Sequence, residues 1–305
     1  MGEPKTLLEA IRYFADPDVC VEFVAKMRWP DGPVCPRCEG REYSYLTTRR
    51  VWKCKSCKRQ YSVKVGSIFE DSAVPLDKWL AAIWLIANSK NGISSHELAR
   101  AIGVSQKSGW FMLHRIRLAM QAGSFDKPRG EIEVDETFIG GKARNMHKHI
   151  RKQKITGTGA KDKTAVIGMY ERGGRLRTEV IPDTQKATVQ PRVRAAVEAG
   201  SSLYTDSMSG YGGLEQDYDH RVVDHAVQYV DGQVHVNGLE NFWCLLKRGL
   251  HGTYISVKPF HLFRYLDERT FTFNERELDD LGRFKVVLRA ITGRRLTYDE
   301  LTGKA

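Results

Sequence analysis

Three acidic residues stand where predicted strands end or where a predicted helix begins. Asp135 lies within or at the end of the strand around Ile132 and Val134, and Asp206 ends a strand over residues 203–205. Glu240 lies on the first turn of a helix predicted over 238–250. Carboxylate oxygens are natural ligands of Mg²⁺, and two such ions about 4 Å apart suit displacement at a phosphodiester. One ion would activate the attacking water or 3′-hydroxyl, and the other would stabilise the leaving oxygen.

Lys247 strengthens this interpretation. It follows Glu240 by seven residues, which is two helical turns, so both side chains point the same way. A cation at that place would hold a phosphate beside the metal ions. Phe242, Leu245 and Leu246 of the same helix are expected to face the core.

Other side chains compete for the ligand places. Glu133 shares a strand face with Asp135. Two acids follow strand-like runs, Asp183 and Asp224, and two amides flank Glu240, Asn237 and Asn241. His235 and His251 are expected to be structural or to face phosphate, because a two-metal mechanism requires no histidine as general base.

Four of the six cysteines form two Cys-x-x-Cys knuckles separated by fifteen residues: Cys35, Cys38, Cys54 and Cys57. Four thiolates close a tetrahedral structural zinc site, and the spacer over residues 41–52 can form the hairpin of a zinc ribbon. A segment this small and polar has little core without a metal. Lys53, Lys55, Lys58 and Arg59 around the second knuckle either contact phosphate or form an ordinary solvated face.

The net charge of +11 favours a polyanionic partner, and nucleic acid is the usual one. No apolar run is long enough to span a bilayer, and residues 1–10 do not resemble a signal peptide. We therefore expect a reducing compartment, in which paired cysteines hold metal. Cys20 and Cys244 stand alone in apolar helical surroundings and are predicted to be small buried hydrophobic residues.

A helical pair precedes the acidic residues. Ser94 and Glu97 form a capping box, Gly103 ends the first helix, and Ser105 caps the next. Two helices joined by a Gly-Val-Ser turn have the outline of a helix-turn-helix. Its second helix begins with residues expected to face a major groove, Gln106, Lys107 and Ser108, and continues with Trp110, Leu113, Ile116 and Arg117. The alternative is a plain helical hairpin in a core.

After a linker at 123–130 the pattern becomes strand, strand, strand, helix, strand, helix, short strand over 221–224, helix. This order fits a ribonuclease H-like fold with Asp135 on the first strand and Asp206 on the fourth. Adjacent places for these strands would bring the two carboxylates together.

The connection between the first two strands is strongly basic. Residues 142–163 contain eight Lys or Arg and one acid, with His147 and His149. We expect this loop to be disordered alone and to clamp target DNA or donor ends.

The segments Val134–Gly141, Tyr204–Ser207 and His235–Tyr254 together resemble bacterial insertion-sequence transposases of the DDE type, in the subgroup with an N-terminal zinc ribbon. The resemblance covers roughly residues 10–275. It implies strand transfer at terminal inverted repeats with Mg²⁺, by a cut-and-paste or copy-out route. Asp135, Asp206 and Glu240 would be the metal-binding acids and Lys247 the trailing basic residue. The implied location is the bacterial cytoplasm, associated with the nucleoid.

The sequence thus predicts an α+β multidomain chain: a zinc ribbon and helix-turn-helix followed by a ribonuclease H-like α/β catalytic domain. The expected divisions are N-terminal helices over 1–30, ribbon over 31–66, helix-turn-helix region over 74–122, catalytic domain over 130–275 and a tail over 276–305. The expected partner is double-stranded DNA, as inverted repeats and target, with a homodimer or larger synaptic assembly and no membrane. The alternatives are a DNA-binding regulator with an inactive transposase fold and a nuclease that cuts without rejoining.

Overall fold

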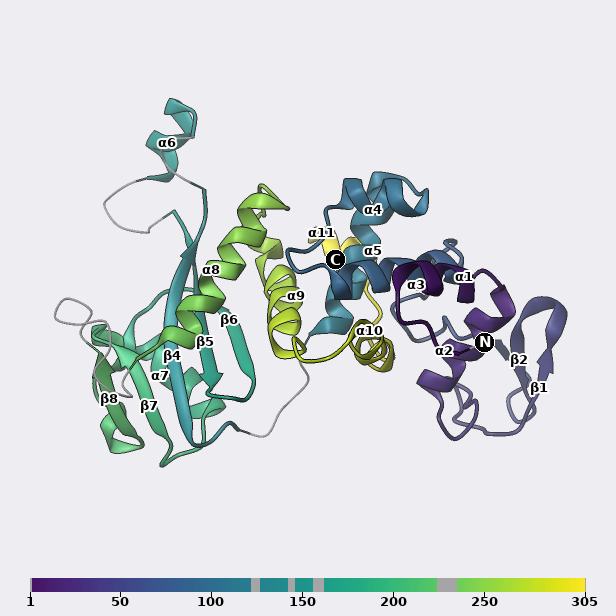
Figure 1. The fold of residues 1–305 in the computed structure, drawn as a ribbon, viewed down its shortest axis with the longest axis horizontal. Coiled ribbons are helices and arrows are strands. Elements are labelled where there is room, and N and C mark those ends of the chain that lie inside the picture. Colours follow the sequence, from purple (N-terminus) through teal and green to yellow (C-terminus); the bar gives the residue numbers. More distant parts are fainter. Residues whose placement is uncertain (1, 122–126, 142–145, 156–161, 224–234, 305) are drawn as a thin grey trace. The chain divides into compact units, whose positions relative to one another are not determined.

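The computed structural model describes residues 2–121, 127–141, 146–155, 162–223 and 235–304. The chain forms two compact units, Met1–Gln121 with Glu275–Ala305, and Ala122–Asn274. Figure 1 labels their helices and strands. In the described part of the chain, no helix combines the length and the apolar character needed to cross a membrane.

The first unit opens with two helices, α1 (Leu7–Tyr13) and α2 (Pro17–Arg28). Thr6 and Glu9 form a capping box at α1. The Asp16 side chain caps α2. Pro17 is the first residue of this helix, a position that suits proline because it has no backbone N–H that needs an intrahelical partner. Both helices lie within residues 1–30, where N-terminal helices were predicted.

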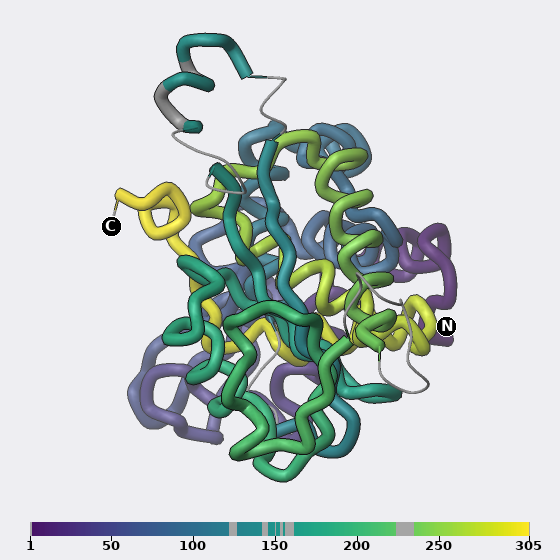
Figure 2. The backbone as a smooth tube through the Cα atoms, turned by 90° about the vertical axis from the view of Figure 1, so that its left-hand side faces the viewer, coloured from purple at the N-terminus to yellow at the C-terminus, as the bar shows by residue number. Residues whose placement is uncertain are grey.

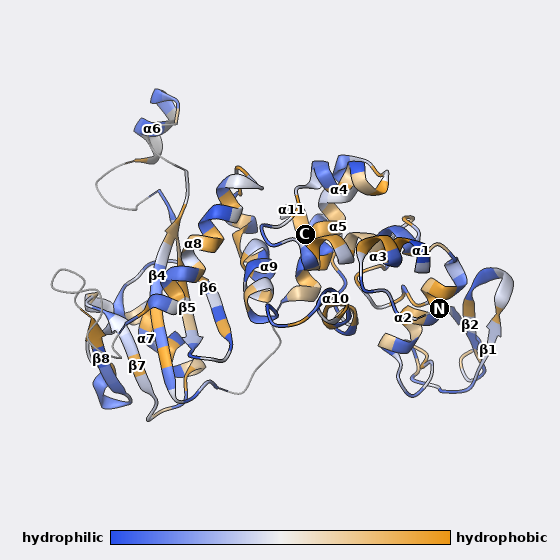
Figure 3. Cartoon of the chain, in the orientation of Figure 1, coloured by the Kyte–Doolittle hydropathy of each residue, from blue (hydrophilic) through white to orange (hydrophobic). Residues whose placement is uncertain are grey.

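Three further helices follow, α3 (Leu76–Asn88), α4 (Ser95–Ile102) and α5 (Gln106–Met120). Helix α3 is apolar over most of its surface, as its colour in Figure 3 shows. Such a surface suits a helix that α1, α2, α4 and α5 all contact. The predicted caps are confirmed: Ser94 and Glu97 form a capping box, Gly103 has φ +63°, and Ser105 accepts from the Ser108 N–H.

Residues 276–305 were expected to be a tail, and this expectation is wrong. They belong to the first unit and form α10 (Asp280–Arg289) and α11 (Tyr298–Thr302). Phe284 of α10 is fully buried, and its ring packs within 6.1 Å of the rings of Phe14, Phe23 and Trp84. Buried Arg115 of α5 donates to the Leu296 carbonyl at 2.9 Å, which fixes the segment beyond α10.

The ribbon is a small antiparallel sheet in the order β1 (Tyr43–Leu46), β2 (Val51–Cys54), β3 (Gln60–Tyr61), with the short 3-10 helix η1 (Thr47–Arg49) at the hairpin tip. The predicted hairpin is confirmed, with Tyr43 opposite Cys54. Trp52 of β2 packs against Trp29 and Tyr61, and these aromatic rings form most of its small core.

The second unit is built on a five-stranded sheet in the order β6-β5-β4-β7-β8. Its strands are β4 (Glu131–Ile139), β5 (Thr164–Glu171), β6 (Leu176–Ile181), β7 (Ser202–Asp206) and β8 (Asp219–Val223). The long strands β4 and β5 are antiparallel and lie side by side in Figure 2. Strand β4 pairs in parallel with β7, and β7 in parallel with β8.

Helices cover both faces of this sheet (Figure 1). Helix α7 (Lys186–Ala196) lies on one face, and α8 (Asn237–Gly252) and α9 (Leu262–Asn274) lie on the other. Strand β5 shows why both faces are covered: Ile167 packs into the α7 core, whereas its neighbour Val166 packs into the α8 core. The remaining short elements are α6 (Lys148–Lys154), η3 (Ser209–Tyr211), η4 (Leu214–Gln216) and η5 (Pro259–His261).

Helix α8 approaches the sheet closely at two glycines. A Cβ on Gly168 of β5 would lie 2.7 Å from Trp243, and one on Gly238 of α8 would lie 2.5 Å from Tyr170. Gly168 is directly opposite Asp135 in the β4–β5 ladder. The missing side chain at Gly168 therefore leaves the space in which Trp243 reaches Asp135.

Candidate active site and zinc centre

The register of the sheet sets Asp135 and Asp206 side by side. The last residue pair of the parallel β4–β7 ladder is Glu133 with Tyr204, and each acid lies two residues further along its strand. Side chains two residues apart share a face, so both carboxylates project toward the face that α8 covers. The adjacency of the two strands confirms what the sequence predicted.

Glu240 comes to this face on the first turn of α8. One turn further, Trp243 donates from its indole Nε1 to Asp135 Oδ2 at 2.8 Å, which fixes the helix against β4. Lys247 is exposed two turns beyond Glu240. One helix thus carries an acid and a cation along the side of the site.

The charges of the two other acids act on the pKa of Asp135. Burial raises the pKa of Asp135 to about 6, the Trp243 hydrogen bond lowers it, and the charges of Asp206 and Glu240 raise it further. A carboxyl held in this way releases its proton more readily when a cation arrives, because the cation offsets both the burial and the neighbouring negative charges.

A fourth acid, Glu136, was missed as a site residue by sequence reasoning. It follows Asp135 directly and faces the α7 side of the sheet, where it accepts a 2.6 Å hydrogen bond from the buried Tyr211 hydroxyl. Burial raises the pKa of Glu136 to about 7, and Asp206 and Asp135 add to the rise. Tyr211 belongs to the turn after Asp206, so Glu136 ties that turn to β4. The only sequence signal was its place beside Asp135.

Glu133, the expected rival of Asp135, is occupied elsewhere. Its side chain is 1 % exposed, pairs with Arg172 at 3.0 Å, and accepts from the Leu239 N–H at 3.0 Å. Arg172 also donates to the His235 carbonyl at 2.8 Å. Glu133 therefore holds the start of α8, and His235 has a structural contact, as expected.

The other rivals lie before α7, on α8 beside Glu240, or outside the described residues. Asp183 is a half-buried residue before α7 and accepts from the Gln185 N–H. Asn237 and Asn241 are exposed on α8, and Asp224 lies outside the described residues. His251 Nδ1 donates to the Lys247 carbonyl at 2.9 Å.

The donor set of Asp135, Asp206 and Glu240 fits a hard cation such as Mg²⁺, which takes oxygen ligands. Among the described residues, the one group of three or more possible ligand atoms lying within 4.8 Å of one another is the cysteine cluster. A magnesium ion would therefore have to draw the three carboxylates closer together.

The four knuckle cysteines do meet the geometry of zinc. Cys35 and Cys57 have their sulfurs 3.7 Å apart, and those of Cys38 and Cys54 are 3.6 Å apart. A tetrahedral ion with Zn–S bonds of about 2.3 Å requires sulfurs about 3.8 Å apart. Backbone hydrogen bonds, first from Cys57, lower the pKa of Cys54 to about 6, which favours the thiolate that a metal needs.

The two knuckles repeat one backbone design. A residue with positive φ follows the second cysteine of each knuckle, Glu39 at +57° and Lys58 at +60°. The first cysteine of each donates its N–H across the turn, Cys35 to Gly40 and Cys54 to Arg59, at 3.0 and 2.9 Å. A Cβ on Gly40 would lie 2.9 Å from Ser56 Oγ and 3.2 Å from Cys54 Sγ, so glycine is required there.

The two remaining cysteines differ from each other. Cys20 is fully buried, as predicted, and donates to the Phe14 carbonyl at 3.1 Å. The prediction that Cys244 is buried is wrong, because it is exposed on α8. It lies one turn from Glu240 and one from Lys247, opposite the stripe that carries Phe242 and Leu246, so helical spacing sets it on the polar face.

The α4–α5 pair presents the residues that the sequence singled out. Gln106 and Lys107 are exposed at the start of α5, with Lys107 Nζ 4.8 Å above the Tyr298 ring. Ser108 is half-buried and hydrogen-bonded to Ser105. Leu113, Ile116 and Arg117 are buried and Trp110 is half-buried. These four residues occupy the inner positions of α5.

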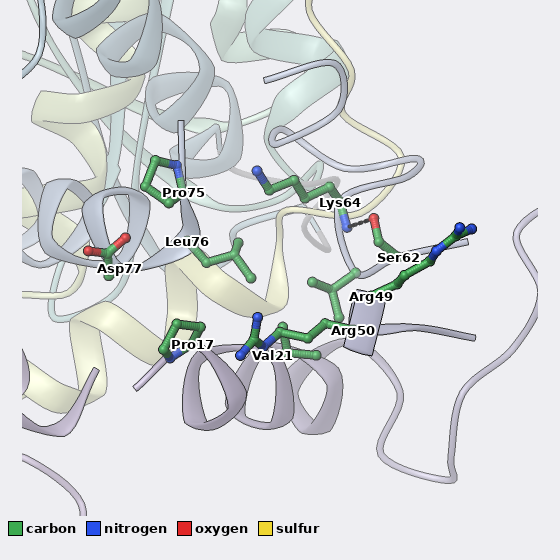
Figure 4. Close-up of a pocket in the computed structure, with 10 residues that line it drawn as sticks. Pro17, Val21, Arg49, Arg50, Ser62, Lys64, Pro75, Leu76 and Asp77 are labelled. Atoms are coloured by element: carbon green, nitrogen blue, oxygen red, sulfur yellow. Dashed lines mark hydrogen bonds between the residues drawn. The ribbon is translucent and has the colours of Figure 1, made fainter. Parts of the chain in front are cut away.

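A pocket of about 220 Å³ in the first unit lies between α2, the hairpin tip and the start of α3 (Figure 4). Two of its cations already have internal contacts: Lys64 Nζ donates to the Ser72 and Val74 carbonyls, and Arg50 pairs with Asp18 at 2.6 Å. These contacts join the hairpin tip to α2, and Lys64 to the segment before α3.

Comparisons with known proteins agree with this arrangement. Residues 128–274 match the ISXO2-like transposase domain, and residues 16–60 match the transposase zinc-ribbon domain. An uncharacterized protein in transposable element ISH50 of Halobacterium salinarum is 30% identical over 260 residues, covering 79% of this chain and 85% of that protein. An uncharacterized transposase-like protein of Haemophilus influenzae is 30% identical over 105 residues, covering 34% of this chain and 85% of its own length. No solved structure matches the chain. The chain therefore belongs to the ISXO2-like transposases, insertion-sequence transposases with an N-terminal zinc ribbon.

Proposed function

We propose that this transposase binds the terminal inverted repeats of its element and catalyses metal-dependent DNA cleavage and strand transfer through Asp135, Asp206 and Glu240. The observation that supports this most is that Asp206 and Glu240 lie near enough to Asp135 for their charges to add to the effect of burial in raising its pKa. The sheet order, with the first and fourth strands adjacent, supports a ribonuclease H-like fold for this unit.

The roles of the groups follow from their places. Asp135, Asp206 and Glu240 would hold Mg²⁺, which supplies activation of the attacking oxygen and charge stabilisation at the phosphate. Trp243 orients Asp135 through its 2.8 Å hydrogen bond, and Glu133 holds the start of the helix that carries Glu240. Lys247 would bind a phosphate of the same DNA strand beyond the acids.

DNA recognition would come from the first unit. Gln106, Lys107 and Ser108 at the start of α5 would read a major groove, and the exposed lysines of the second knuckle would contact phosphate. The ribbon, held by zinc, would fix the position of those lysines. In the second unit, the basic connection over 142–163, described here only in part, would hold target DNA or donor ends. Joining two ends calls for a dimer or larger assembly.

Glu240→Gln is expected to lower cleavage by about a thousandfold, because the amide keeps the shape of the side chain and loses a metal-binding charge. The assay follows a labelled duplex carrying the inverted repeat that flanks the gene, with Mg²⁺. Asp183→Asn, the same kind of change at an acid before α7, is the matched control and should cleave normally. Tight binding without cleavage by the wild-type protein would instead favour the alternative, a DNA-binding regulator that retains the fold.

A further inference from the structure

The turn after α8 exposes apolar side chains in a manner that requires explanation. Ile255 is 81 % exposed, the highest fraction of any large apolar side chain in the described residues, and Phe260 is 56 % exposed. Phe263 at the start of α9 is 41 % exposed. Leaving an isoleucine in water forgoes about 1.5–3 kcal/mol of burial free energy.

The backbone at Ile255 is also strained. Its φ is +60°, a left-handed conformation that β-branched residues strongly disfavour. The Ser256 N–H donates to the Tyr254 carbonyl at 2.6 Å and closes a three-residue turn around Ile255. Such conformations cost about 1–3 kcal/mol and persist only where the surroundings impose them.

The flanking residues impose this conformation. The Tyr254 ring packs against Tyr265 at 4.7 Å, and its hydroxyl donates to fully buried Glu268. The Thr253 N–H donates to Gly249 at 3.0 Å, and Val257 packs into the α8 core. Ile255 is therefore held outward by fixed neighbours on both sides.

The stretch of chain that contains this turn carries cations and no acid. From Lys247 to Arg264 the chain has four Lys or Arg, two His and no acid. Lys247, Arg248, His251 and Lys258 are all exposed. An apolar tip near these exposed cations suits DNA, whose phosphates meet the cations while the tip reaches the bases. A second copy of the chain fits poorly, because it would bring the same cations face to face.

The tip also lies in line with the proposed active site. Glu240, Cys244, Lys247 and His251 follow one stripe of α8, with spacings of four, three and four residues. From Glu240 to the end of the helix at Gly252, twelve residues span about 18 Å at 1.5 Å each. That length corresponds to about five base pairs at 3.4 Å each.

We propose that Ile255 is a wedge that enters the base stack of duplex DNA lying along α8, about five to six base pairs from the phosphate that meets the acids. Lys247 and Lys258 bind the phosphates on either side of it. The distance to the cleaved phosphate rests on the proposed function, whereas the insertion itself does not. The wedge would kink the duplex and fix the position of the cleaved strand.

The test uses Ile255→Gly in the full chain. Glycine accepts a φ of +60° without strain, so the variant should unfold at the same temperature as wild type or higher. Duplexes carry the flanking inverted repeat with 2-aminopurine at one position at a time, and its fluorescence rises when the base loses its stacking partner. Wild type should raise the signal only around the fifth or sixth base pair. The variant should lose this rise, bind nearly as tightly, and cleave about tenfold more slowly, which equals 1.4 kcal/mol.

Two variants serve as controls. Ile255→Leu keeps a large apolar side chain and should retain the signal, and Val222→Ala changes another exposed apolar residue, on β8, and should have no effect. An unchanged signal in Ile255→Gly would overturn the wedge. A change of mass in sedimentation, with the signal unchanged, would show that this surface binds a second copy instead.

The wedge and the proposed chemistry can fail separately. Asp135→Asn should keep the 2-aminopurine signal and lose cleavage. A wild-type protein that gives the signal but cleaves nothing would contradict the proposed function and leave the wedge supported. Normal cleavage without a localised signal would support the proposed function and contradict the wedge.

Discussion

Asp135→Asn is expected to abolish cleavage, by about a thousandfold or more, and at the same time to make the metal-free protein more stable at pH 8. Burial and the neighbouring acids raise the pKa of Asp135 from its ordinary 3.8 to about 6. At pH 8 the native state must therefore hold a carboxylate that its surroundings disfavour. Asparagine keeps the acceptor for the Trp243 N–H and removes the charge, so we expect a gain of about 2–3 kcal/mol.

The sign of the pH dependence follows from the direction of the shift. A raised pKa means that the stability contributed by the protonated Asp135 is fully present below pH 4 and is lost as the pH rises through about 6. Wild type and Asp135→Asn should therefore unfold alike at pH 4 and differ at pH 8. Calorimetry in buffer without Mg²⁺ measures this difference. A variant less stable than wild type at pH 8 would contradict the electrostatic account.

With Mg²⁺ added, wild type should become more stable than Asp135→Asn. Mg²⁺ binds the native carboxylates and stabilises wild type by mass action, while Asp135→Asn should respond little. Asp183→Asn is again the matched control, because this acid lies before α7 and its hydrogen bonds lower its pKa. It should show neither the gain at pH 8 nor the loss of cleavage.

Removal of zinc is the second change with a large expected effect. The binding free energy of a structural zinc site is of the order of 10 kcal/mol, and the ribbon has little beyond the Trp29, Trp52 and Tyr61 rings to replace it. A strong chelator, or Cys57→Ser, should unfold residues 31–66 and expose Trp29 and Trp52. Tryptophan fluorescence should shift to longer wavelength, and binding to inverted-repeat DNA should weaken.

Cys244→Ser is the control for this experiment. Cys244 is exposed on α8 and is not a member of the four-cysteine cluster, so the variant should still contain one zinc per chain by elemental analysis. An ordered ribbon in zinc-free protein, with the wild-type tryptophan spectrum, would contradict the structural role of the metal.

The sequence predicted most elements because their signals are local. Strand alternation located β4 to β7, and the Ser94 and Ser105 caps with Gly103 located α4 and α5. The adjacency of Asp135 and Asp206 followed from strand order alone. Helix α10 was not predicted to belong to the first unit, because the surface that it covers depends on Phe14, Phe23 and Trp84, more than 190 residues earlier.

The details of the site depended on contacts that no local pattern reports. Glu133 and Asp135 occupy equivalent positions in the strand pattern. Glu133 differs because it contacts Arg172 and the Leu239 N–H and so holds the start of α8, whereas Asp135 is the proposed metal ligand. Trp243 reads as a core residue, yet its indole N–H orients Asp135 across the space left by Gly168. Cys244 was predicted to be buried because of its residue type, although its spacing from Glu240 already indicated the polar face of the helix.

The most direct test of the account asks whether the three acids touch the metal. Asp206→Cys replaces a hard oxygen ligand with a softer thiolate, which accepts Mn²⁺ more readily than Mg²⁺. We predict that Asp206→Cys fails to cleave the labelled inverted-repeat duplex with Mg²⁺ and regains cleavage with Mn²⁺, while wild type cleaves with both; Asp135→Cys and Glu240→Cys should behave alike. Failure of Mn²⁺ to restore any of the three, with rescue at Glu133→Cys or Glu136→Cys instead, would contradict the assignment of the metal site.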